Sequence, residues 1–209
     1  MHKLKLEFMP KATQRNFARL KDDPRLADFT LVGGTALALQ IGHRISEDLD
    51  FNIFGQKLPI KAIDRLLDDL AASGAVIESL ITSEQKLGFK INTSENLDHY
   101  IQDYLIDGAK VTFHSRHEGD RPKAQIDFLK SAQKIKVSDT GYDVMGLDGL
   151  FVMKSIVVYD VTPQGHHFVE AFEFGDKLEE DGDEDKLAPK LEAIKDCAIV
   201  YVAAIGGSG

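Results

Sequence analysis

Residues 31–51, LVGGTALALQIGHRISEDLDF, decide the fold of this chain. The apolar run 28–32 predicts a strand that ends in the turn Gly33-Gly34-Thr35, and residues 35–41 predict a compact helix. Residues 48–54, DLDFNIF, alternate polar and apolar side chains, which is typical of a half-buried strand. Strand, glycine turn, helix and strand in this order favour an α/β or α+β domain.

The rest of the chain continues this alternation of helical and strand-like patterns. Residues 10–21 and 61–72 predict helices, and residues 147–159 predict one buried helix. Four further strands are predicted over residues 75–81, 87–92, 109–115 and 124–129. We expect a main domain over residues 1–158, a short C-terminal segment over residues 159–205 and a linker-like end at residues 206–209.

The net charge is concentrated near the end of the chain. The 209 residues carry a formal charge of −9, and residues 170–185 alone contribute −8. The remainder is nearly neutral, so the acidic balance does not exclude a nucleic-acid partner. The acidic segment is interpreted either as a solubilising stretch or as an acidic mimic that covers a basic surface. Cys197 is the single cysteine, and no signal peptide or membrane-spanning run is expected, so we predict a cytoplasmic protein.

The glycine turn is a candidate phosphate site. Gly33 and Gly34 let backbone amides approach a ligand, and the helix that follows offers unpaired N–H groups and the positive end of its dipole. Thr35 is expected either to donate a hydrogen bond to the ligand or to cap the helix. The alternative is that the two glycines only make a tight turn.

Carboxylates supply a candidate metal site. Asp48 and Asp50 are two residues apart on a strand and share a face, where a divalent cation such as Mg²⁺ would relieve their repulsion. Asp127, within the predicted strand 124–129, becomes a third carboxylate on that face if the two strands are neighbours, and three carboxylates can hold two metal ions. The alternatives are a solvated polar face or a turn-capping aspartate for the Asp48–Asp50 pair and an exposed edge-strand position for Asp127. Lys154 lies on the apolar stripe of the predicted helix, where it points into a polar pocket or snorkels to the rim.

These motifs, in this order, resemble the DNA polymerase β-like nucleotidyltransferase superfamily. Residues 31–51 look more closely like the AbiEii type of abortive-infection toxins, through Gly33-Gly34-Thr35, His43-Arg44, Ser46 and Asp48-Leu49-Asp50-Phe51. Asp127 and Lys154 match the family's third carboxylate and its lysine-bearing helix, so the resemblance covers roughly residues 29–158. It implies a nucleotidyltransferase fold, with a mixed sheet flanked by helices.

The resemblance also implies a reaction: transfer of a nucleoside monophosphate from a nucleoside triphosphate to an acceptor hydroxyl. Asp48, Asp50 and Asp127 would hold Mg²⁺, or Mn²⁺, and Asp127 would also position the nucleophile. Gly33, Gly34 and Thr35 would bind the triphosphate, Lys154 would neutralise its charge, and Arg44 would reach it or pair with Glu47 or Asp48. The implied acceptor is RNA, notably the 3′ end of tRNA, with a protein hydroxyl as the alternative, and the implied partner is a cognate antitoxin.

Two further features bear on this expectation. Residues 110–136 carry seven basic side chains against three acidic ones, which favours contacts with RNA phosphates, the alternative being a mixed solvated surface. After residue 159 the sequence departs from the family pattern, because the usual basic-acidic helical signature is missing. A catalytically impaired module that binds a nucleotide or an antitoxin is therefore the alternative function.

Overall fold

The computed structural model describes residues 4–116, 123–154, 156–162 and 165–172. The chain divides into two compact units, Met1–Leu150 and Phe151–Gly209, and this division falls before the boundary predicted at residue 158. The predicted segment 159–205, its acidic stretch 170–185 and the end 206–209 lie mostly or wholly outside the described residues. No helix in the described part of the chain is long and apolar enough to cross a membrane.

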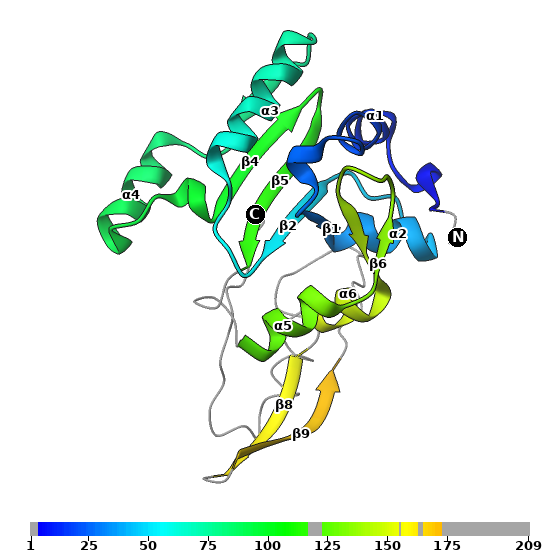
Figure 1. Cartoon of the computed structure of the whole chain (residues 1–209), viewed down its shortest axis with the longest axis vertical. Coiled ribbons are helices and arrows are strands. Elements are labelled where there is room, and N and C mark those ends of the chain that lie inside the picture. The colour runs from blue at the N-terminus through cyan, green and yellow to red at the C-terminus, as the bar shows by residue number, and fades with distance from the viewer. Residues whose placement is uncertain (1–3, 117–122, 155, 163–164, 173–209) are drawn as a thin grey trace, which may run out of the picture. The chain divides into compact units, whose positions relative to one another are not determined.

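The first unit is a seven-stranded mixed sheet with helices packed around it, which confirms the expected fold class (Figure 1). The helices are α1 (Lys11–Leu20), α2 (Gly33–Ile41), α3 (Ile60–Ala72), α4 (Ser83–Thr93), α5 (Lys123–Ser131) and α6 (Leu147–Lys154), the last of which continues into the second unit. The strands of this unit are β1 (Thr30–Val32), β2 (Leu49–Phe54), β3 (Ile77–Ser79), β4 (Ile101–Ile106), β5 (Ala109–Arg116), β6 (Lys134–Lys136) and β7 (Asp143–Met145). Their order across the sheet is β3-β4-β5-β2-β1-β7-β6.

The strand–turn–helix–strand unit read from residues 31–51 is confirmed. β1 runs antiparallel to β2, with Val32 opposite Asp50, and α2 fills the connection between them. β2 in turn pairs in parallel with β5, so β2 is an interior strand. This position fixes what surrounds the Asp50 face of β2.

The apolar face of β2 forms the centre of the core. The Phe51 ring stacks on Phe113 of β5, with centroids 5.6 Å apart, and meets Tyr142 edge-on at 4.7 Å. Tyr142 also packs against Phe17 of α1 and donates a hydrogen bond to its carbonyl oxygen. Since side chains alternate along a strand, burying Phe51 on this face turns Asp50 to the opposite one.

Three predicted elements are wrong, and each has a local physical reason. Residues 87–92 lie within α4, whose start at Thr82 is fixed by a capping box with Gln85. Residues 124–129 lie within α5, where the buried positions Ile126 and Leu129 have helical spacing rather than the alternation of a strand.

The predicted helix 147–159 is the third. It ends at Lys154, and residues 156–162, IVVYDVT, form strand β8, which pairs antiparallel with β9 (Gly165–Phe172) in the second unit. β-branched and aromatic side chains in succession favour a strand over a helix.

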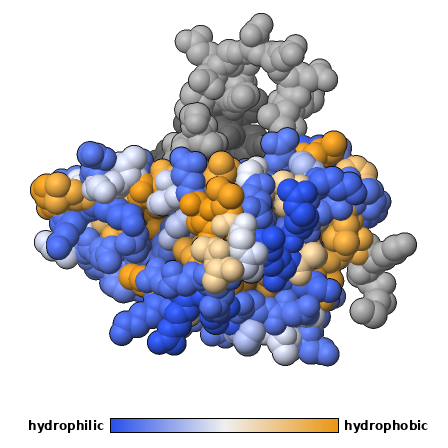
Figure 2. Space-filling model, turned by 90° about the horizontal axis from the view of Figure 1, so that it is seen from above, coloured by the Kyte–Doolittle hydropathy of each residue, from blue (hydrophilic) through white to orange (hydrophobic). Residues whose placement is uncertain are grey.

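The visible surface is largely hydrophilic. Figure 2 shows apolar side chains in small separate groups among hydrophilic ones on the face in view. Exposed apolar residues include Leu87 and Ile91 of α4, one helical turn apart.

Candidate functional site

The site forms where the end of β1, the start of α2 and the start of β2 meet. Gly33 has φ +72°, and a Cβ atom there would lie 2.6 Å from Oδ2 of Asp50. The left-handed backbone therefore favours glycine at this position, and an added methyl group would also displace the Asp50 carboxylate. Asp50 is thus held against the first turn of α2, whose N–H groups have no partner within the helix.

Gly34 has different neighbours. A Cβ atom at Gly34 would lie 2.9 Å from Nη2 of Arg44 and 3.1 Å from Oγ of Ser46. The guanidinium of Arg44 therefore lies over the same first turn of α2. This position is compatible with the predicted contact between Arg44 and a triphosphate.

Thr35 holds the segment that leads into β2. Its buried hydroxyl is hydrogen-bonded to Oγ of Ser46 at 2.8 Å and donates to the backbone carbonyl of Asp48. The residue before α2 is Val32, which makes no side-chain cap, so the expected capping role of Thr35 is wrong. Its hydroxyl instead fixes Asp48 relative to α2, and its backbone N–H belongs to the first helical turn.

The Asp48–Asp50 pair has the electrostatics of a cation site. The pKa of Asp50 is raised to about 6, first by burial and then by the negative charge of exposed Asp48. A buried carboxylate with a like charge beside it is stabilised by a divalent cation, and hard Mg²⁺ prefers such oxygen ligands. The two carboxylates therefore fit the metal that the family implies.

Asp127 does not join this pair as expected. It lies on α5 and is exposed, and α5 approaches β2 at Gly55, where Nζ of Lys130 and Cγ2 of Ile126 are its neighbours. Gly55 follows the far end of β2, about 16 Å along the strand from Asp50. The predicted face shared by three carboxylates is therefore wrong, and no group of three metal-ligating residues was found among the described residues.

Lys154 is the last residue of α6 and its side chain lies outside the described part of the structure, so its role stays a prediction.

The position beside Asp50 on β5 is occupied by Thr112. Thr112 is paired with Asp50 on one side and with Asp103 of β4 on the other. Its hydroxyl donates to Oδ1 of Asp103 at 2.7 Å, and Nζ of Lys110 lies 3.3 Å from Oδ2 of Asp103. The charge of Asp103 is a further cause of the raised pKa of Asp50, which Lys110 opposes.

Sequence reasoning missed Asp103 because β4 was not predicted. A signal was present in Asp107-Gly108, a dipeptide that favours a two-residue hairpin turn between strands. In the structure both residues have positive φ, +47° and +80°, and they connect β4 to β5.

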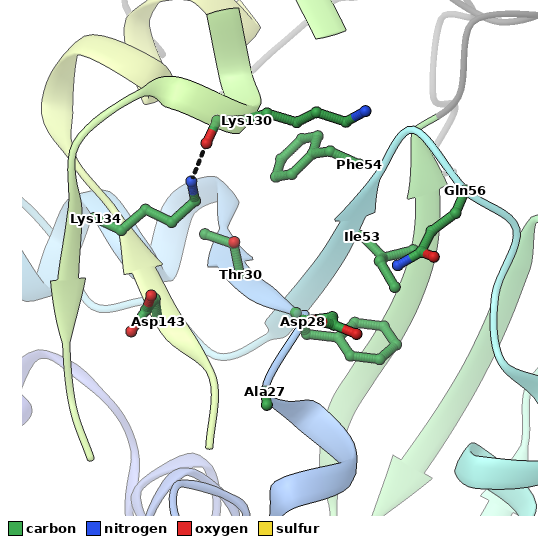
Figure 3. Close-up of a pocket in the computed structure, with 10 residues that line it drawn as sticks. Ala27, Asp28, Thr30, Ile53, Phe54, Gln56, Lys130, Lys134 and Asp143 are labelled. Carbon is green, nitrogen blue, oxygen red and sulfur yellow. Dashed lines mark hydrogen bonds between the residues drawn. The ribbon is translucent and has the colours of Figure 1, made fainter. Parts of the chain in front are cut away.

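A shallow pocket of about 300 Å³ lies at the other end of β2. Figure 3 shows Lys130 above the pocket, Lys134 on its left, Phe54 and Gln56 on its right, and Asp28 and Asp143 in the lower part of the view. Lys134 donates from Nζ to the backbone carbonyl of Lys130 at 2.7 Å. The pocket places two of the basic residues counted in the segment 110–136 on the sheet face that carries Asp50.

Two families of known proteins match this chain, one mainly within each of its two compact units. Residues 17–139 match the model of the family described as nucleotidyl transferase AbiEii toxin, type IV TA system. Residues 153–209 match a different family, described as dinitrogenase iron-molybdenum cofactor. Asp48, Asp50, Asp103 and Thr112 lie in the first match, whereas Lys154 lies in the second.

The curated relatives that match are proteins named NifX. The chain is 62% identical over 56 residues to NifX of Herbaspirillum seropedicae, covering 27% of this chain and 38% of that protein. It is 42% identical over 91 residues to NifX of Azotobacter vinelandii, covering 42% of this chain and 57% of that protein. The chain therefore spans less than two thirds of the length of either relative. No solved structure matches the chain.

Proposed function

We propose a function from the premise that this chain belongs to the AbiEii family of nucleotidyltransferase toxins, whose model matches more than half of its residues. The first unit, Met1–Leu150, binds a nucleoside triphosphate with Mg²⁺ and transfers the nucleoside monophosphate to an acceptor hydroxyl, with release of pyrophosphate. The observation that carries the proposal is the Asp50 carboxylate held against the first turn of α2 at Gly33. The contact supports the proposal, because a metal–triphosphate needs a carboxylate for its cation beside a helix terminus for its phosphates.

Each residue of the site has a separate role in this proposal. Asp48 and Asp50 hold the cation, which when bound neutralises charge on the triphosphate. The N–H groups at Gly33, Gly34 and Thr35 receive the phosphate oxygens. Arg44, over Gly34, adds a positive charge to the same side. Catalysis on this scheme rests on positioning and electrostatic stabilisation rather than on a covalent intermediate.

The acceptor we propose is RNA, and by family resemblance the 3′ end of tRNA. The support in this chain is positive charge on the Asp50 face: Arg116 lowers the pKa of Asp50, and Lys130 and Lys134 line the pocket at the far end of β2. Such cations contact backbone phosphates. A toxin of this kind would act in the cytoplasm and be restrained by a cognate antitoxin.

A second candidate is a module that binds the nucleotide without turning it over. The observation that favours it is Thr112, a neutral residue, in the position beside Asp50 where a third carboxylate would share the cation. A site with two carboxylates still binds a metal–triphosphate but lacks an anionic group to deprotonate the acceptor.

The second unit suggests a separate role. Because residues 153–209 match the iron–molybdenum cofactor family and the NifX proteins, we propose that this unit takes a metal cluster of that kind as cargo, without catalysis. Incubating the full chain with an iron–molybdenum cluster, followed by gel filtration and metal analysis, tests this. Cluster that does not travel with the protein would contradict it.

One assay separates transfer from binding. The full chain is incubated with each α-labelled triphosphate, Mg²⁺ and total RNA, beside the variant Asp50→Asn. Transfer of label by the wild type and its loss in the variant are expected. Bound nucleotide without labelled RNA would favour the second candidate, and undiminished transfer by Asp50→Asn would overturn the metal-site assignment.

A further inference from the structure

Three neighbouring strands of the sheet place Asp50, Thr112 and Asp103 in one row. Thr112 is the partner of Asp50 across β2 and β5, and Asp103 is the partner of Thr112 across β5 and β4. Partners in register project from the same face, and adjacent strands are about 4.8 Å apart. The Thr112 hydroxyl therefore lies between the cation-binding carboxylate and a carboxylate that the proposed mechanism does not use.

The hydrogen bonds in this row fix the direction of the Thr112 hydroxyl. Its one proton is given to Oδ1 of Asp103 at 2.7 Å, and the other oxygen of Asp103 lies 3.3 Å from Nζ of Lys110. A hydroxyl has one donor and two acceptor lone pairs, so a committed proton leaves the oxygen only its lone pairs to offer. Thr112 is 7% exposed, and its setting leaves little freedom to rotate away.

We infer that Asp103 is a positioning residue for the cation site, which it serves by taking the proton of Thr112 so that the neutral Thr112 oxygen faces a divalent cation at Asp48 and Asp50. The inference rests on the proposed function, since it concerns the same cation. On this inference the cation has two carboxylate ligands and one neutral oxygen ligand. Asp103 and Lys110 do not bind the cation, but orient the Thr112 hydroxyl. A partner that orients a metal ligand in this way changes metal affinity about 10- to 100-fold when removed.

The competing explanation is that Asp103 acts on the cation only through space, by its negative charge. The two explanations differ in one respect. An effect that passes through the Thr112 hydroxyl disappears once that hydroxyl is gone, whereas a through-space effect persists. A double-mutant cycle measures this difference.

The experiment titrates the full chain with Mn²⁺ alone and follows free Mn²⁺ by electron paramagnetic resonance, so no turnover is needed. The variants are Thr112→Val, Asp103→Ala and the double variant, each checked for an unchanged circular dichroism spectrum. We expect Thr112→Val and Asp103→Ala each to weaken Mn²⁺ binding about tenfold. The double variant is expected to bind as weakly as Thr112→Val alone.

Two controls keep the result interpretable. Thr112→Ser keeps the hydroxyl and is expected to retain wild-type affinity, which separates the hydroxyl from packing. Asp69→Ala removes a largely exposed carboxylate that pairs with Arg25 on another part of the unit, and no change is expected.

The outcomes separate this inference from the proposed function. Mn²⁺ binding that is lost in Asp50→Asn but unchanged in Thr112→Val would overturn the inference alone. An equal loss from Asp103→Ala in both backgrounds would also overturn it, in favour of the through-space explanation. Wild-type protein that binds no Mn²⁺ would overturn the cation site itself, and with it the proposed function.

Discussion

Gly33 and Asp50 are in contact across the turn between β1 and α2: a Cβ atom on Gly33 would lie 2.6 Å from Oδ2 of Asp50. Gly33 also has φ +72°, a conformation that costs other residues about 1–2 kcal/mol. The contact joins the start of α2 to the Asp50 carboxylate, so a larger side chain at Gly33 would disturb both.

Gly33→Ala is expected to destabilise the protein and to weaken Mn²⁺–triphosphate binding, because the new methyl group displaces Asp50. Gly74→Ala is the matched control: Gly74 has φ +91° with nothing within 4 Å of a Cβ atom, so it bears the backbone cost alone. Thermal unfolding and Mn²⁺ titration of both variants check this. Equal Mn²⁺ affinity in the two variants would contradict the proposed contact.

The raised pKa of Asp50 predicts how its charge affects stability. Because the pKa in the folded protein is about 6 against an ordinary value of 3.8, the folded state holds more protons than the unfolded state between these values. The free energy of unfolding therefore falls as pH rises from about 4 to 6, relative to a variant without this charge. Asp50→Asn is expected to be more stable than wild type at pH 8, and the difference to vanish near pH 3.

Urea unfolding across this pH range measures the effect, and Asp69→Asn, at a largely exposed carboxylate, is the control. Adding Mg²⁺ at pH 8 is expected to stabilise the wild type and not Asp50→Asn. A wild type whose stability relative to Asp50→Asn does not change with pH would contradict the raised pKa.

Thr35 is expected to matter through its hydroxyl rather than its shape. Thr35→Val keeps the side-chain volume but leaves the Asp48 carbonyl and Ser46 without their buried partner, at a cost of about 1–3 kcal/mol. Thr35→Ser restores the hydroxyl and is expected to recover most of the stability and the Mn²⁺ affinity. If Thr35→Val unfolds like the wild type in urea, these hydrogen bonds do not hold the segment before β2.

The pocket at the far end of β2 is expected to contribute to RNA affinity. Lys130→Glu should weaken binding of a single-stranded RNA, and the slope of log K against log salt should fall by about 1 for the phosphate contact that is lost. Lys61→Glu, at an exposed position of α3, makes the same charge change away from the pocket. A slope that changes equally in both variants would indicate a general charge effect and no RNA contact at the pocket.

Patterns within a few neighbouring residues predicted several helices and strands correctly. The alternation of residues 48–54 predicted β2, and the helical spacing of residues 61–72 predicted α3. The pattern of residues 124–129 fits a strand at first sight, yet packing of Ile126 and Leu129 requires a helix. The strand pattern predicts the wrong surface for Asp127, because side chains repeat every 3.6 residues on a helix and every two on a strand.

The sequence by itself determined the glycine turn, the helix after it and the carboxylate pair, because each depends on residues within a few positions of one another. Only the tertiary structure decided which residues stand beside that pair. Asp50 meets Thr112 through a parallel pairing of β2 with β5, which joins segments some 60 residues apart. Thr112 in turn meets Asp103 across the β4–β5 hairpin. The pairing of β2 with β5 is set by how the whole core packs around Phe51, Phe113 and Tyr142, and no short pattern in the chain encodes it.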